Sequence, residues 1–122
     1  MKLAESDRSV MEVFWERGPM FARDVATGLN KRLGWSKTTT YTMLTRCVAK
    51  GYLSRSEPKF LCKPLLTREQ VANEETETLL RNHFSGSADL LVAALVGQQK
   101  LNAAQIKELY ELLRQMEETC EP

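Results

Sequence analysis

Apolar residues recur every three or four positions over residues 5–17 and again over 21–32, which predicts two amphipathic helices. The first predicted stripe consists of Val10, Val13, Phe14 and Arg17. The second consists of Ala22, Val25, Ala26, Leu29 and Leu33. Gly18-Pro19 and Gly34 follow these segments as stop signals. Because both helices are short, their stability must come from packing the two stripes together.

A third predicted helix spans residues 36–50, with Ser36 as its N-cap and Gly51 as its stop. Its core stripe consists of Met43, Leu44, Cys47 and Val48, with Thr40 one turn earlier. The opposite face carries Thr38, Tyr41, Thr42 and Thr45, with Lys37 at the N-terminal end and Arg46 at the edge. This helix therefore separates an apolar face from a hydroxyl-rich, basic one.

The threonines of this third segment carry a local cost, because threonine is a mediocre helix former. Short hydroxyl side chains beside Lys, Tyr and Arg suit contacts with phosphates and base edges. The alternative is a β-prone or loop segment in which the threonines have no role. We therefore take the polar face of the segment as a candidate nucleic-acid surface and keep the alternative open.

Two short runs in residues 52–63 flank the turn Ser-Glu-Pro-Lys, which predicts a β-hairpin. Arg55, Lys59 and Lys63 make the hairpin basic. Three helices followed by a basic hairpin form the plan of a winged helix-turn-helix. In that plan the third helix enters the major groove of DNA, and the hairpin, or wing, lies on the backbone or an adjacent groove.

The chain after Pro64 predicts only helices. A capping box at Thr67–Gln70 opens a helix toward Phe84, and Ser85-Gly86-Ser87 interrupts it. Residues 88–96 are apolar nearly all round. A second capping box at Asn102–Gln105 precedes a helical stripe made of Ile106, Leu109, Leu112, Leu113 and Met116.

A helix that is apolar on all sides needs more cover than one amphipathic neighbour supplies. The economical source is the same half of a second chain in a two-fold dimer. The alternative is that this half folds back on the N-terminal domain. The predicted dimer contacts are Leu79, Phe84, Leu91, Val92, Leu95, Val96, Ile106, Leu109 and Leu113.

Composition sharpens this division into two domains. The 122 residues have a net charge of only +1, which argues at first sight against a nucleic-acid partner. Residues 1–64, however, hold twelve Lys and Arg against six Asp and Glu, a net charge of +6. Residues 65–122 hold five against ten, a net charge of −5. The sequence thus predicts a mainly α protein with a basic winged-helix domain at 1–64 and an acidic helical dimerisation domain at 65–122.

Several other classes of protein find no support in the sequence. The longest apolar run, residues 90–96, is far shorter than the ~20 residues of a membrane span, and no signal segment opens the chain, so we expect a cytoplasmic protein. Cys47, Cys62 and Cys120 lack zinc-site spacing, and His83 has no nucleophile motif near it. We therefore predict no metal, no cofactor and no enzymatic activity.

At this point the residues resemble a known family, the penicillinase and methicillin-resistance repressors (BlaI/MecI), which also includes the copper-responsive CopY-type relatives. The resemblance covers about residues 3–115, and its most specific part runs from Gly34-Trp35-Ser36 to Lys50-Gly51. The other matching stretches are 10–15, 18–19, 22–26, 52–53, 64–69, 84–87 and 91–96.

The resemblance implies a homodimeric bacterial repressor that binds a palindromic operator through the helix 36–50. The candidate DNA-binding residues are Ser36, Lys37, Thr38, Thr39, Tyr41, Thr42, Arg46, Arg55 and Lys59. Tyr41 stands where family members often have a basic or small residue, and the wing is about two residues shorter than in typical members. The alternative is a winged helix that binds another protein, which a flat salt dependence of DNA binding would indicate.

The family also suggests two inducing signals. Antibiotic-responsive members are inactivated by a membrane sensor protease at an Asn-Phe bond, and Ala94-Leu95 occupies that position here, so identity does not support cleavage. Copper-responsive members carry a C-terminal Cys-x-Cys cluster, whereas this tail has only Cys120. The resemblance therefore leaves the inducing signal open.

Overall fold

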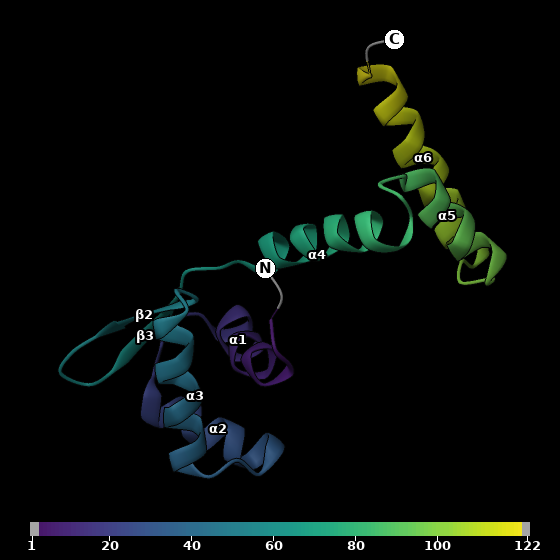
Figure 1. Ribbon diagram of the computed structural model, residues 1–122. Helices are drawn as coiled ribbons and strands as arrows, with labels where there is room; N and C mark the ends of the chain where they lie inside the picture. Colours follow the sequence, from purple (N-terminus) through teal and green to yellow (C-terminus); the bar gives the residue numbers. More distant parts are fainter. Residues whose placement is uncertain (1–2, 121–122) are drawn as a thin grey trace. The chain divides into compact units, whose positions relative to one another are not determined.

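The computed structural model describes residues 3–120. Six helices and three short strands follow one another along these residues in the order α1-β1-α2-α3-β2-β3-α4-α5-α6 (Figure 1). The chain divides into two compact units, the first ending at Thr76 and the second beginning at Glu77.

The first three helices confirm the predicted ones closely. They are α1 (Glu5–Arg17), α2 (Ala22–Leu33) and α3 (Lys37–Ala49). Gly18 and Gly34 follow α1 and α2 with φ of 76° and 71°, the left-handed region that glycine enters without steric cost. Of the predicted stripes, Arg17 and Leu33 are exposed, because each is the last residue of its helix and lies beyond the packed turns.

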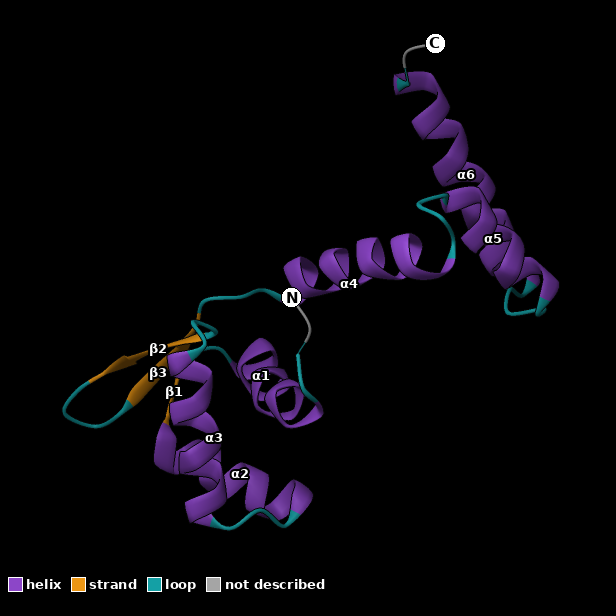
Figure 2. Cartoon of the chain, viewed as in Figure 1, coloured by secondary structure: helices purple, strands orange, loops and turns teal. Residues whose placement is uncertain are grey.

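The sheet has one strand more than the predicted hairpin. Strands β2 (Leu53–Ser56) and β3 (Leu61–Pro64) form the expected antiparallel pair, with Arg55 opposite Cys62. The additional strand β1 (Met20–Phe21) pairs antiparallel with β3, so the strand order is β1-β3-β2 (Figure 2). This pairing ties the start of α2 to the wing.

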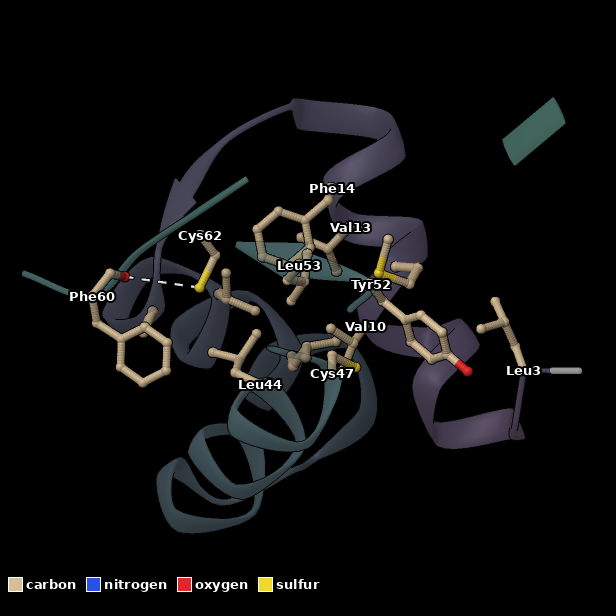
Figure 3. Packing of buried hydrophobic residues seen from close by; sticks show 14 of the residues in the cluster. Leu3, Val10, Val13, Phe14, Leu44, Cys47, Tyr52, Leu53, Phe60 and Cys62 are labelled. Atoms are coloured by element: carbon tan, nitrogen blue, oxygen red, sulfur yellow. Dashed lines mark hydrogen bonds between the residues drawn. The ribbon is translucent and has the colours of Figure 1, made fainter. Parts of the chain in front are cut away.

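One hydrophobic core holds these elements together. Leu44 and Cys47 of α3 are fully buried beside residues of α1 and of the wing, including Phe14 and Leu53 (Figure 3). Met11 is also fully buried, although it lies outside the predicted stripe. The predicted core residues Met43 and Val48 are only partly buried and pack against the edge of this core.

Helix α4 (Arg68–His83) begins at the predicted capping box, in which Thr67 Oγ1 accepts from the Gln70 amide and Gln70 Oε1 accepts from the Thr67 amide. The first unit extends past the predicted boundary at residue 64, because the start of α4 packs on α1. Val71 is 2% exposed within the core, and Trp15 donates its indole N–H to the Leu66 carbonyl at 2.9 Å.

The second unit contains α5 (Ala88–Gly97) and α6 (Ala103–Thr119), which lie side by side (Figures 1 and 2). The predicted capping box at Asn102 and Gln105 is confirmed. No residue of either helix is buried. Within residues 3–120, no helix combines the length and the apolar character that crossing a membrane requires.

Candidate nucleic-acid interface

Helix α3 starts with a tightly bonded N-terminus. Ser36 Oγ accepts from the Thr39 amide at 3.1 Å and donates to Thr39 Oγ1 at 2.9 Å. These bonds satisfy an amide that the helix itself leaves without a partner. Two predicted DNA-binding residues, Ser36 and Thr39, therefore also form the N-cap that fixes the start of α3.

The exposed face of α3 forms a shallow depression. It is lined by Lys37, Thr38, Tyr41, Thr42 and Thr45, the face that the sequence predicted. Thr42 Oγ1 donates to the Thr38 carbonyl at 2.9 Å, which leaves the hydroxyl oxygen as an acceptor and the methyl group as an apolar contact. Arg46 is exposed one turn further along α3. A hydroxyl and methyl surface flanked by cations can contact both base edges and phosphates.

Tyr41 is the least exposed member of this face, because its ring contacts the wing. The ring lies edge-to-face with Phe60, with centroids 5.7 Å apart and planes at 88°. Lys37 Nζ is 5.7 Å from the centroid of the same ring. Tyr41 therefore packs between the N-terminal cation of α3 and the wing, a role that the sequence did not indicate.

The predicted cations of the wing are exposed. Arg55 lies on β2, Lys63 on β3, and Lys59 in the turn between the two strands. The Arg55 guanidinium carbon lies 3.6 Å from the Phe60 ring centroid, and Arg55 Nε pairs with Glu57. The structure thus brings Arg55 close to Tyr41 of α3 through one shared aromatic neighbour.

A second basic depression borders Lys37 on the side of α2. It is lined by Arg23, Ala26, Thr27, Asn30, Lys31 and Lys37. Asn30 Nδ2 donates to the Trp35 carbonyl at 3.0 Å, which fixes the loop between α2 and α3. This surface was not predicted from the sequence, although two of its cations, Arg23 and Lys31, lie on the second predicted helix.

The C-terminal end of α3 is anchored by a buried charge. Asp7 of α1 is fully buried, and its Oδ2 accepts from Lys50 Nζ at 2.8 Å. Burial, and then the nearby Asp7 carboxylate, raise the pKa of the Cys47 thiol to about 12. Cys47 is therefore a protonated core residue rather than a reactive thiol.

The predicted dimerisation residues are unevenly exposed. Val92, Val96, Ile106, Leu109 and Leu113 line an apolar groove between α5 and α6, together with Gln99, Leu101 and Tyr110. Leu95 is 37% exposed and Leu91 is half-buried, and both lie on α5 outside this groove. Leu79 lies on α4 and Phe84 directly follows that helix, and neither residue lines the groove.

The Ala94-Leu95 bond lies inside α5. The Ala94 carbonyl accepts from the Gln98 amide at 3.0 Å, and the Leu95 carbonyl accepts from the Lys100 amide at 3.1 Å. Cleavage of this bond would require α5 to unwind locally, since a protease binds its substrate in an extended conformation.

Together, these elements define a winged-helix protein with a basic, threonine-rich third helix, and comparisons with known proteins agree. The profile of the penicillinase repressor family matches residues 3–115. The penicillinase repressor of Bacillus licheniformis is 24% identical over 116 residues, spanning 93% of this chain and 91% of that protein. The methicillin resistance regulatory protein MecI of Staphylococcus aureus (strain N315) is 21% identical over 114 residues, spanning 92% and 93%.

Two solved structures are similar to the first unit. One is the solution structure of the DNA binding domain of the repressor BlaI, with 27% identity and a TM-score of 0.52 over 57% of this chain and 87% of that one. The other is monomeric BlaI of Bacillus licheniformis in complex with the blaP half-operator, with 26% identity and a TM-score of 0.50 over 57% and 88%. The chain belongs to the penicillinase repressor family.

Proposed function

We propose that this chain is a transcriptional repressor, not an enzyme, that binds a two-fold symmetric DNA operator as a homodimer through α3. The observation that carries the proposal is the exposed face of α3, where hydroxyl side chains lie between Lys37 and Arg46 beside a basic wing. The similar structure of BlaI with its half-operator supports DNA as the partner. Because the proposed partner is operator DNA, we place the protein in the cytoplasm.

The roles of the side chains follow from their positions. Lys37, Arg55, Lys59 and Lys63 contact phosphates and orient the protein, whereas Thr38 and Thr42 reach base edges. Ser36 and Thr39 contribute mainly by fixing the helix N-terminus (2.9 Å between their hydroxyls). A single hydroxyl discriminates weakly between bases, so specificity requires two half-sites, about 34 Å or a multiple of that apart.

The homodimer forms through the second unit. Large apolar side chains of α5 and α6 are exposed there, including Val96 at 58% and Leu113 at 56%. An apolar surface of this kind is unstable in water and marks an interaction site. A second copy supplies a matching surface, because a two-fold interface joins the same patch on both chains.

One candidate route of induction is the one used by antibiotic-responsive members of the family, in which a membrane sensor protease cleaves the repressor. In this chain the corresponding bond joins Ala94 and Leu95 within a hydrogen-bonded helix. We propose that induction by this route depends on local opening of α5.

The experiment is a selection of bound duplexes from a random pool, followed by affinity measurements on the selected operator. Arg46→Ala should weaken binding roughly tenfold or more, because an arginine contact to DNA is worth about 1–3 kcal/mol. Arg114→Ala on α6 is the charge-matched control and should bind as the parent chain does, since Arg114 pairs with Glu111 far along the sequence from α3.

If Arg46→Ala bound the operator as well as the parent chain does, α3 would not be the helix that contacts the bases. The competing function, a winged helix that binds another protein, predicts no enriched duplex and no fall in DNA affinity with salt. Such a result would reject the repressor function altogether.

A further inference from the structure

Phe60 has an unusual backbone for a large residue. It lies in the turn after β2 with φ of 53°, yet the residue is only 8% exposed. Bulky L-residues rarely enter this left-handed region, and they stay there only when surrounding contacts hold them. The contacts that hold Phe60 therefore indicate what the wing is built to position.

Those contacts join the wing to two helices. The Phe60 carbonyl accepts from the Ala22 amide at 3.0 Å, and Ala22 is the first residue of α2, where amides lack helical partners. The Phe60 ring receives the edge-to-face contact of Tyr41 from α3. Phe60 lies at the edge of the cluster of core residues drawn in Figure 3, and one face of its ring lies against Arg55.

That face carries Arg55. The Arg55 guanidinium carbon lies 3.6 Å from the Phe60 ring centroid, the distance of a direct cation–π stack. Glu57 engages the Nε edge of the same guanidinium. Two neighbours thus orient a side chain that is still 40% exposed, and the terminal Nη edge is the one suited to a phosphate.

From this geometry we infer that Phe60 and Tyr41 are positioning residues, which hold Arg55 pre-organised to bind a DNA phosphate from the wing. The inference rests on the proposed function. It assigns to two uncharged residues, Phe60 and Tyr41, a role in DNA binding that acts through Arg55. Arginine normally loses rotamer freedom when it binds, and the stack on Phe60 removes that freedom before DNA arrives. Tyr41 supports the platform from α3, so the wing and the reading helix keep one relative geometry.

The test is the salt dependence of operator binding. Each phosphate contact contributes about 0.9 to the slope of log affinity against log salt. Losing one contact from each chain of the dimer therefore lowers the slope by about 1.8, which changes the affinity ratio between 50 and 200 mM salt about twelvefold. We expect the slope of log affinity against log salt to be smaller by this amount for Arg55→Ala than for the parent chain. We expect Phe60→Leu, which stays apolar but lacks the ring, to lose the same slope although Arg55 is still present.

The double variant Arg55→Ala/Phe60→Leu should have the slope of Arg55→Ala alone, because both changes remove the same contact. Tyr52→Leu is the matched control: it removes another buried ring of the first unit, one that has Lys50 Nζ 5.9 Å from its centroid, and it leaves the Tyr41, Phe60 and Arg55 contacts in place, so the slope should stay at that of the parent chain. If Phe60→Leu fails to fold, Tyr41→Leu removes the edge contact from the α3 side and should reduce the slope instead.

The outcomes separate this inference from the proposed function. If Phe60→Leu weakens binding equally at every salt concentration, its role is structural and the inference is wrong. If Arg55→Ala keeps the parent slope, Arg55 binds no phosphate and the inference is also wrong. If the parent chain itself binds no duplex with a salt-dependent affinity, the proposed function has failed instead.

Discussion

At the scale of single residues, the first unit buries one charged group and two thiols. Asp7 is fully buried and paired with Lys50, and Cys47 and Cys62 are fully buried thiols. Burial raises the pKa of Cys62 to about 11, and burial together with Asp7 raises that of Cys47 to about 12, against an ordinary value of 9.0. Both thiols are therefore neutral in the folded protein up to strongly alkaline pH.

These two pKa values predict a stability that falls at high pH. The unfolded chain releases its thiol protons near pH 9, while the folded chain keeps them, so the folded state binds more protons above that pH. The contribution of the thiols is fully present below pH 9 and is lost as pH rises toward 11 and 12. We expect the urea midpoint to fall between pH 8 and 11 more steeply for the parent chain than for Cys47→Ala/Cys62→Ala.

The double variant shares every other titrating group with the parent chain, so it removes their contribution from the comparison. Equal pH slopes for the two proteins would mean that the thiols ionise alike in the folded and unfolded chains. The double variant should also have lower urea midpoints at every pH, because removing two buried sulfur atoms itself lowers stability.

Residue pairings of this kind were beyond sequence reasoning. The helical period placed Leu44 and Cys47 in the core, but it could not show that Asp7 lies opposite them, because that contact joins residues 40 positions apart. Tyr41 was expected to face DNA, and its packing on Phe60 depends on the path of a turn. Local patterns predict which face of a helix is polar. Long-range contacts decide which polar residues on that face pack against other elements of the protein.

At the scale of elements, the contact between α1 and the start of α4 combines two kinds of interaction. Two ion pairs cross it, Arg8 with Glu75 at 2.5 Å and Glu12 with Arg68 at 2.6 Å. All four side chains are substantially exposed, so each pair is worth only about 0–1 kcal/mol. Val71, 2% exposed, contributes the apolar part of the contact.

We therefore expect Val71→Ala to destabilise the first unit more than loss of either ion pair. Removing two buried methyl groups costs about 2 kcal/mol, including the cavity left behind. Arg8→Ala should cost less than about 1 kcal/mol, and that cost should shrink further in high salt. Urea unfolding of the three proteins at two salt concentrations measures both effects, and a larger loss for Arg8→Ala would show that the ion pair dominates.

The elements themselves were largely predictable, because caps, stop glycines and periodicity are local signals. Ser36, Thr67 and Asn102 each marked a helix start that the structure confirms. The strand β1 was missed, since two residues carry no alternation and acquire strand geometry only by pairing with β3. The extent of the first unit was missed for the same reason: Val71 belongs to a core that its own helix does not reveal.

At the scale of the whole molecule, the two units differ in how they bury apolar surface. The first has a core of its own, whereas α5 and α6 contain no buried residue as a single chain. A helical pair this exposed is poorly stable alone, because association, not propensity, supplies most helix stability. The proposed homodimer therefore also completes the fold of the second unit.

Leu113→Glu tests the dimer directly. A two-fold interface receives each substitution twice, so two carboxylates would enter an apolar contact, and we expect monomers at concentrations where the parent chain is dimeric. Leu65→Glu is the matched control, since Leu65 and Leu113 are both 56% exposed but Leu65 lies in the first unit. Analytical ultracentrifugation gives the mass of each protein.

Operator binding gives the second readout for these two variants. Leu113→Glu should bind a full operator no better than a half-operator, whereas Leu65→Glu should keep the advantage of two sites. If Leu113→Glu remained dimeric, the dimer interface would not lie at the α5–α6 groove.

The distribution of the cysteines has a practical consequence for watching this protein at work. Two thiols are enclosed in the first unit and one, Cys120, is exposed just after α6. An alkylating reagent therefore adds one label to a folded chain and three to a chain whose first unit has opened. A mass spectrum taken after a brief labelling pulse counts opened molecules directly, and repeating the pulse with operator present reports how strongly DNA holds the first unit closed.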